Sequence, residues 1–164
     1  MIIKRLNSIP IQYIVKHWFF EDLKIICEND VLIPRPESKK IVELVISIIE
    51  FIIIEIINLE RLKPDLMRFM EIGVGSGVLF MLILKKYPDI TFVGIDINKN
   101  AINLSLKNLK MNKIFFMKTH LEAIDFKDFQ VLPNQKFDFI ITNPPYIPLR
   151  DKNTVQKELK YNLC

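Results

Sequence analysis

The residues with the clearest chemical potential lie where an apolar run meets a polar turn, in the segment 137–146, which reads FDFIITNPPY. Proline has no N–H donor and a fixed φ, and the residue before a proline is biased toward an extended conformation. The predicted strand therefore ends in a stiff turn that offers the Asn143 side-chain oxygen and nearby carbonyls as acceptors, beside the ring of Tyr146. Such a turn suits a planar NH₂ group. Because Asn and Pro are also ordinary turn residues, a simple strand-ending turn is the alternative.

A glycine-rich loop upstream forms a second candidate site. Three of the chain's four glycines fall in the run EIGVGSG at 71–77. Glycine allows a positive φ and lets a ligand approach the backbone closely, and the helix that follows presents its N-terminal amides to that ligand. The loop predicts a dinucleotide or another nucleoside cofactor. The residues that we assign to cofactor binding here are Glu71, Gly73, Val74, Gly75, Ser76 and Gly77.

Two acidic residues narrow the choice of cofactor. Asp96 ends the run VGID at 93–96, where a carboxylate can accept both hydroxyls of a ribose. The alternative for Asp96 is a helix N-cap, because Ile97 and Asn98 begin a predicted helix. The Glu71 carboxylate can bind a cationic group of a ligand, directly or through water. Asp96, Glu71 and the glycine loop together match S-adenosylmethionine, which has a ribose, a carboxylate and an amino group but no pyrophosphate.

Alternating strands and helices position these residues. The pattern predicts strands at 66–72, 91–96, 114–118 and 137–142 and helices at 78–86 and 101–110, with a short helix at 121–129 and a loop at 133–135. Short apolar strands that alternate with helices indicate a parallel sheet with right-handed crossovers. The segment 10–33 alternates apolar and polar residues and predicts a small β-hairpin. We therefore expect a hairpin and linker at 1–38 and an α/β domain at 39–164.

Composition excludes several classes of function. The chain has 164 residues, 50% of them hydrophobic, which is enough for one domain with a hydrophobic core. Its net charge of +4 is spread along its length, so the charge permits an anionic partner but does not require one. Cys27 and Cys164 are too few and too distant to indicate a disulfide framework, and His17 and His120 offer no metal-ligand spacing. We therefore expect no bound metal and a reduced intracellular compartment.

One segment imitates a membrane helix. Residues 41–59 are rich in isoleucine, but they include Glu43, Glu50 and Glu55, which are costly at the centre of a bilayer. The polar residues fall near one helical face, so we interpret the segment as a largely buried amphipathic helix that begins near Lys39. The first residues lack a signal-peptide pattern. The prediction is a protein without a membrane span.

The motifs in combination resemble a known family. The run EIGVGSG, the acidic residue that ends the second strand and the run NPPY that ends the fourth resemble class I methyltransferases of planar nitrogens. The run VLIPRPES at 31–38 closely resembles the L-I-P-R-P-E-T signature of the HemK/PrmC release-factor glutamine methyltransferases, and PIQYI at 10–14 with Phe19-Phe20 resembles the segment before that signature. The resemblance covers most of the chain, from Ile9 to Tyr146.

The resemblance implies a fold and a function. The fold would be α/β, a Rossmann-like class I methyltransferase sheet preceded by the hairpin. The function would be S-adenosylmethionine-dependent N5-methylation of a glutamine in the Gly-Gly-Gln motif of peptide chain release factors. A release factor would be the partner, without direct nucleic-acid binding. The protein would be a monomer in the cytoplasm, or in a mitochondrion or another organelle.

The resemblance also implies site residues. Asn143, Pro144, Pro145 and Tyr146 would bind the acceptor amide and carry the catalysis, Asn143 would also face the cofactor, and Arg35 would shape the substrate mouth. Family members commonly have an Asp near the adenine where the third strand ends. Here the sequence has His120-Leu121, so we assign these two residues to cofactor binding at that place.

Three departures from the family pattern define the alternatives. Ser38 stands where the family usually has Thr. Family members begin with a helical domain and continue past NPPY through further strands, so we expect a partial domain without its C-terminal strands that is a poor enzyme when alone. The rival functions are a nucleic-acid adenine or guanine N-methyltransferase, which would need a base-flipping region, and an inactive fragment of the glutamine methyltransferase.

Overall fold

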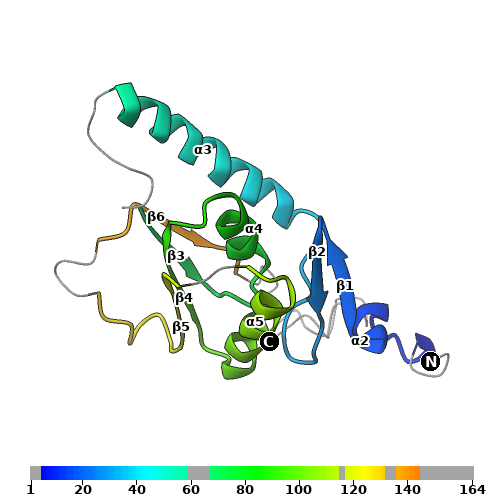
Figure 1. The fold of residues 1–164 in the computed structure, drawn as a ribbon. Coiled ribbons are helices and arrows are strands. Elements are labelled where there is room, and N and C mark those ends of the chain that lie inside the picture. The colour runs from blue at the N-terminus through cyan, green and yellow to red at the C-terminus, as the bar shows by residue number, and fades with distance from the viewer. Residues whose placement is uncertain (1–4, 59–66, 115–116, 132–135, 145–164) are drawn as a thin grey trace.

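The computed structural model describes residues 5–58, 67–114, 117–131 and 136–144, and it shows helices packed against a parallel sheet, with a separate hairpin near the N-terminus (Figure 1). The elements in chain order are α2 (Ile11–Val15), β1 (His17–Phe20), β2 (Leu23–Ile26), α3 (Ser38–Asn58), β3 (Arg68–Ile72), α4 (Val78–Lys86), β4 (Thr91–Asp96), α5 (Lys99–Met111), β5 (Thr119–Ala123) and β6 (Phe139–Thr142).

The main sheet has the strand order β5-β4-β3-β6, and all three pairings are parallel. The chain moves from β3 outward through β4 to β5 and then returns to the other side of β3 with β6. Ile72 is therefore opposite Ile95 in one neighbour and Thr142 in the other. The carboxyl ends of these strands meet at one edge, and a reversal of strand order of this kind creates a crevice for ligands there.

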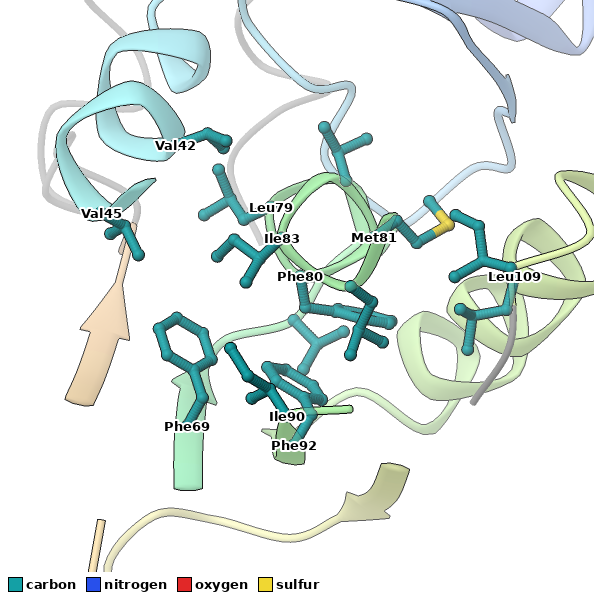
Figure 2. Close-up of a cluster of buried hydrophobic side chains, with 14 of the residues drawn as sticks. Val42, Val45, Phe69, Leu79, Phe80, Met81, Ile83, Ile90, Phe92 and Leu109 are labelled. Carbon is teal, nitrogen blue, oxygen red and sulfur yellow. The ribbon is translucent and has the colours of Figure 1, made fainter. Parts of the chain in front are cut away.

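Aromatic side chains fill the core between the sheet and α4. The ring of Phe92 stacks on Phe69, with 5.6 Å between their centroids, and on Phe80, at 4.5 Å. Figure 2 shows Phe69 and Phe92 rising from their strands toward Phe80, which points down from α4. Both strand residues are 1% exposed, as expected for a parallel sheet that is covered by helices.

The hairpin and α3 share this core. Strands β1 and β2 are antiparallel, and Leu23 and Ile25 of β2 belong to the same buried cluster as the sheet. Val42 and Val45 of α3 point toward Leu79 and Ile83 of α4 (Figure 2). Burying side chains of this size stabilises the folded state by about 1.5–3 kcal/mol each, so α3 is firmly attached along this face.

The outer face of α3 carries large apolar side chains that are exposed. Leu44, Phe51 and Ile54 are each more than half exposed, at 61%, 64% and 58%. One side of the helix packs on the core, as predicted, but the prediction of a largely buried helix is wrong, because the far side carries exposed apolar residues as well as charged ones. Among the described helices, none combines the length and the apolar character needed to cross a bilayer.

Most predicted elements form close to their expected positions. Helix α4 and strand β4 have the predicted bounds, and β3, α5 and β6 end within one residue of the prediction. The hairpin is confirmed as β1 and β2, although the helix α2 before it was not predicted. The predicted loop at 133–135 lies outside the described residues.

The third strand of the main sheet was predicted wrongly. The sequence indicated a strand at 114–118 and a helix at 121–129, whereas the structure has β5 at 119–123 and a turn after it, with the Asp128 N–H donating to the Asp125 carbonyl. Ile114 instead closes α5, because its N–H donates to the Leu109 carbonyl and its side chain is buried under the helix. The strand therefore starts later than the apolar residues suggest.

Candidate active site

A cavity of about 400 Å³ lies at the carboxyl edge of the sheet. Its wall combines the loop after the hairpin, the first residue of α3, the glycine loop and the residues that follow β4, β5 and β6. The residues that line it are Asp30, Val31, Leu32, Pro34, Ser38, Glu71, Ile72, Gly73, Val74, Gly75, Ser76, Val78, Leu79, Ile95, Asp96, Ile97, Asn98, Ala101, Ile124, Asp125, Phe126, Asn143 and Pro144. A volume of this size is typical of small-molecule sites.

The glycines of the loop have different structural roles. Gly75 has φ +55° and lines the cavity, and no atom lies within 4 Å of the place a Cβ would occupy. Gly77 has φ +86°, and a Cβ there would lie 2.8 Å from the Phe80 ring and 2.9 Å from Ser105. Gly77 does not belong to the cavity wall. It allows α4 to pack against α5, while Gly75 leaves room for a ligand beside the backbone.

Asp96 is held by the backbone at the end of β4. One carboxylate oxygen accepts the Gly75 N–H at 2.8 Å, and the other accepts the Asn98 N–H at 2.9 Å. The N-cap of α5 is Asn98, whose side chain accepts the Asn100 N–H at 2.9 Å. Asp96 is therefore not the helix cap, and its half-buried carboxylate lies in the cavity wall beside the glycine loop.

Glu71 is the buried acid of the site. It is 1% exposed, and among the described residues its Oε2 atom has no hydrogen-bond partner. Burial raises the pKa of the Glu71 carboxyl well above its ordinary value, the negative charge of Asp96 raises it further, and the backbone N–H of Phe80 opposes both. An uncompensated buried carboxylate is unfavourable, so burial favours the neutral form of Glu71 and a cation beside it would favour the ionised form.

Asn143 lies beside the glycine loop. It follows Thr142, which pairs with Ile72 in the parallel register, so it comes level with the first glycine of the loop. Its side-chain nitrogen donates to the Ser38 hydroxyl at 3.3 Å. Pro144 also lines the cavity. Pro145 and Tyr146, the other residues predicted in this turn, lie outside the described residues.

Besides Gly77, three predicted residues of the described part of the chain do not line the cavity. His120 is exposed within β5, where its ring nitrogen is 3.4 Å from a Glu122 oxygen, and Leu121 packs under Gly94. The assignment of these two residues to the cavity is corrected by the register of β5, which ends at Ala123. Arg35 is exposed and does not line the cavity either.

The residues that follow β5 take the place of His120 and Leu121 in the cavity wall. They are Ile124, Asp125 and Phe126. The Ile124 N–H donates to the Asp96 carbonyl at 2.9 Å, which fixes this segment beside the end of β4. Phe126 is 56% exposed. The error in the strand position hid this acidic residue and its aromatic neighbour from the sequence analysis.

Buried amides that were not predicted connect the hairpin to the glycine loop. Asn108 of α5 is fully buried, accepts the Ile26 N–H at 2.8 Å and donates to the Ser76 carbonyl at 2.9 Å. Asn98 donates to the Asp30 carbonyl at 2.7 Å. The hairpin and its loop are therefore part of the cavity's framework. In the sequence, the spacing of four residues between Asn108 and Asn112 places both amides on one face of a helix, and this could have indicated that they have a structural role.

The known proteins that are similar to this chain are methyltransferases. The family model "Methyltransferase small domain" matches residues 56–162. Release factor glutamine methyltransferases from Dictyoglomus turgidum and Flavobacterium psychrophilum are 33% and 31% identical to the chain, over 95% and 92% of its length. These matches cover 51% and 48% of the two relatives, so the chain spans about half the length of the curated relatives it matches.

A solved structure supports the fold. The N-terminal domain of human METTL16, in a complex with SAH, superimposes with a TM-score of 0.55 and 18% identity, over 88% of this chain and 53% of that one. At this identity the likeness concerns the fold alone, and it agrees with the predicted Rossmann-like sheet.

Proposed function

The chain belongs to the methyltransferase small domain family, and from this premise we propose that it transfers a methyl group from S-adenosylmethionine to the side-chain nitrogen of a glutamine. The names of its relatives, release factor glutamine methyltransferases, support a glutamine of a release factor as the acceptor, and we propose that this glutamine belongs to a Gly-Gly-Gln motif. The observation that carries the proposal is that the turn after β6 and the glycine loop after β3 line one cavity.

The cavity residues fit the cofactor. The Asp96 carboxylate would accept the ribose hydroxyls, and the Gly75 backbone leaves space for the ligand. The Oε2 atom of Glu71, which has no hydrogen-bond partner in the described part of the chain, would meet the cationic amino group, and this charge would compensate the buried carboxylate. Asp125 and Phe126 would take the adenine, because a carboxylate accepts from its exocyclic amine and an aromatic face stacks on its ring.

The part of the cavity beside Asn143 and Pro144 would have to activate an amide nitrogen. An amide nitrogen is a poor nucleophile because its lone pair is delocalised into the carbonyl. The Asn143 oxygen and the Pro144 carbonyl would accept the two N–H groups, hold the nitrogen in place and stabilise the positive charge that develops on it. When bound, S-adenosylmethionine would supply the methyl group from its sulfonium. Transfer would break the C–S bond as the N–C bond forms, and the methylated amide nitrogen would release a proton to solvent.

The other substrate contacts, the partner, the oligomeric state and the location are proposed from the resemblance to the family. Pro145 and Tyr146 would fix the plane of the substrate amide, and Arg35, which is exposed, would contact the substrate outside the cavity. The release factor as partner, the monomeric state and the location in cytoplasm or an organelle belong to the same proposal.

Transfer to defined acceptors tests the proposal. The purified chain is incubated with methyl-labelled S-adenosylmethionine and either a Gly-Gly-Gln peptide, the matched Gly-Gly-Asn peptide or an adenine-containing oligonucleotide. We expect one methyl group on the glutamine nitrogen, formed at a low rate and located by tandem mass spectrometry, and none on the other acceptors. Label on the oligonucleotide, or on no acceptor, would contradict the proposal.

A further inference from the structure

The side chain of Asn108 in α5 joins the glycine loop to the hairpin. It is 0% exposed, its nitrogen donates to the Ser76 carbonyl at 2.9 Å, and its oxygen accepts the Ile26 N–H at 2.8 Å. A backbone carbonyl can only accept a hydrogen bond and a backbone N–H can only donate one. The two partners therefore fix which end of the Asn108 carboxamide faces the loop.

The Ser76 carbonyl belongs to the peptide bond that joins the glycine loop to α4. The N–H of the same peptide bond, on Gly77, donates to the Val74 carbonyl at 2.9 Å. Gly77 has φ +86°, and a glycine changes its backbone conformation easily because it has no Cβ. The orientation of this peptide plane therefore depends on the hydrogen bonds at its oxygen and at its nitrogen.

Asn108 acts on the cavity from behind the loop. Gly75 and Ser76 line the cavity, whereas Asn108 does not. The Asp96 carboxylate holds the loop by the Gly75 N–H at 2.8 Å, and Asn108 holds it one residue later by the Ser76 carbonyl. A ligand in the cavity would touch the loop and not Asn108, so Asn108 would affect the ligand through the position of the loop.

We propose that Asn108 is a positioning residue that keeps the glycine loop in the conformation that binds S-adenosylmethionine. This inference rests on the cofactor of the proposed function and not on its acceptor. Removal of the Asn108 carboxamide should weaken cofactor binding. Because coupling between two equilibria is reciprocal, bound cofactor should in turn strengthen the hydrogen bond between Asn108 and Ser76.

Asn112, one turn further along α5, provides a matched control. Its side-chain nitrogen donates to the Lys24 carbonyl at 2.9 Å and its oxygen accepts the Lys24 N–H at 3.0 Å, so it also binds β2 with both ends of the carboxamide. Its nitrogen donates as well to the Asn108 carbonyl at 2.8 Å. Within the described residues these bonds reach the hairpin and α5 but not the glycine loop. Asn112→Ala therefore removes the bonds between helix and hairpin alone.

The first experiment compares the full-length wild type, Asn108→Ala and Asn112→Ala. Calorimetry measures the affinity for S-adenosylmethionine at a temperature well below the lowest Tm of the three chains. We expect Asn108→Ala to bind about tenfold more weakly, the effect of one lost hydrogen bond. Asn112→Ala should keep the wild-type affinity although its Tm falls. Wild-type affinity in Asn108→Ala would overturn the proposal, and so would an equal loss of affinity in both variants.

A second experiment uses only the wild type, so it decides the matter even where Asn108→Ala does not fold. NMR of the ¹⁵N-labelled side-chain amides measures the exchange of their protons with solvent, with and without S-adenosylmethionine. The NH₂ protons of Asn108 should exchange more slowly in the presence of the cofactor, and those of Asn112 should exchange at the same rate. An unchanged rate at Asn108 would overturn the proposal.

The outcomes for this inference and for the proposed function are separate. Cofactor binding that depends on Asn108, in a chain that transfers no methyl group to the Gly-Gly-Gln peptide, would contradict the proposed function and support the role of Asn108. Transfer to the peptide, with cofactor affinity unchanged in Asn108→Ala, would support the proposed function and overturn the role of Asn108.

Discussion

The Asp96 carboxylate accepts the Gly75 backbone N–H at 2.8 Å, so that the acid at the end of β4 and the middle glycine of the loop after β3 form one unit. The second carboxylate oxygen is engaged by the Asn98 N–H at 2.9 Å. This arrangement orients the carboxylate before any ligand arrives. Preorganisation of this kind reduces the cost of ordering the site when a cofactor binds.

The first prediction concerns this carboxylate. Asp96→Ala should weaken binding of S-adenosylmethionine by about 1.5–3 kcal/mol, the value of hydrogen bonds to a charged acceptor. Isothermal calorimetry measures the change. Asp89→Ala is the control, because Asp89 is exposed and precedes the same strand at its opposite end. Equal affinities of the two variants, both folded, would remove the ribose role from Asp96.

The second prediction concerns Glu71 and pH. Burial raises the pKa of this carboxyl well above its ordinary value of 4.5. Above pH 4.5 the unfolded chain releases a proton that the folded chain retains, so the free energy of unfolding falls as pH rises toward the raised pKa. Glu71→Gln should remove this decline in the free energy of unfolding. Denaturant unfolding at several pH values between about 5 and 8 measures the free energy of unfolding for both chains.

The same substitution has a consequence for the cofactor. Binding of a cationic amino group favours the ionised form of Glu71, so proton release should accompany binding, and affinity should rise with pH in the wild type. Glu71→Gln should weaken binding and remove its pH dependence. Calorimetry in buffers of different ionisation enthalpy counts the protons. Proton release that persists unchanged in the variant would assign it to another group.

The third prediction separates the two glycines. Gly77→Ala places a methyl group 2.8 Å from the Phe80 ring at a positive φ, so it should destabilise the fold by about 1–3 kcal/mol. Gly75→Ala shares the strain of a positive φ, at +55°, but its methyl group meets no atom within 4 Å, so its loss of stability should be smaller and its main effect should be weaker cofactor binding. Chemical denaturation and calorimetry on both variants provide the comparison. A larger loss of stability in Gly75→Ala would reverse these roles.

The fourth prediction concerns the residues after β5. Asp125→Ala should weaken cofactor binding by about 1 kcal/mol, the typical contribution of one hydrogen bond, because Asp125 lines the cavity. His120→Ala is the control, since His120 is exposed on the strand and does not line the cavity. A loss of cofactor affinity in His120→Ala and none in Asp125→Ala would support the original assignment of His120 to cofactor binding.

The sequence predicted the parts of the fold that depend on local patterns. Helix α4 and strand β4 have the expected bounds because short apolar runs are bordered there by glycine, proline or acidic residues. The placement of Asp96 and Glu71 beside the glycine loop followed from the parallel order of the strands. The prediction failed at β5, because the apolar residues before it include Ile114, which packs under α5 instead of forming the strand.

Long-range contacts of the site could not be predicted in this way. The hydrogen bond between Ser38 and Asn143 joins residues 105 positions apart, and it depends on how α3 packs on the sheet. The burial of Asn108 depends likewise on the hairpin, because its partners are the Ile26 N–H and the Ser76 carbonyl. Contacts of this kind arise from the three-dimensional arrangement, and the residue types alone do not specify them.

The most direct test of the central claim is to measure methyl transfer and cofactor affinity together in the wild type and in Asn143→Ala. The claim is that one cavity holds the methyl donor beside an acceptor turn in which Asn143 binds the substrate amide. We expect the wild type to methylate the glutamine of a Gly-Gly-Gln peptide. The variant should lose about 10²–10³-fold in kcat, by analogy with the loss of one oxyanion-hole donor, and keep its affinity for S-adenosylmethionine. Near-normal transfer by Asn143→Ala, or no transfer by the wild type, would contradict the account.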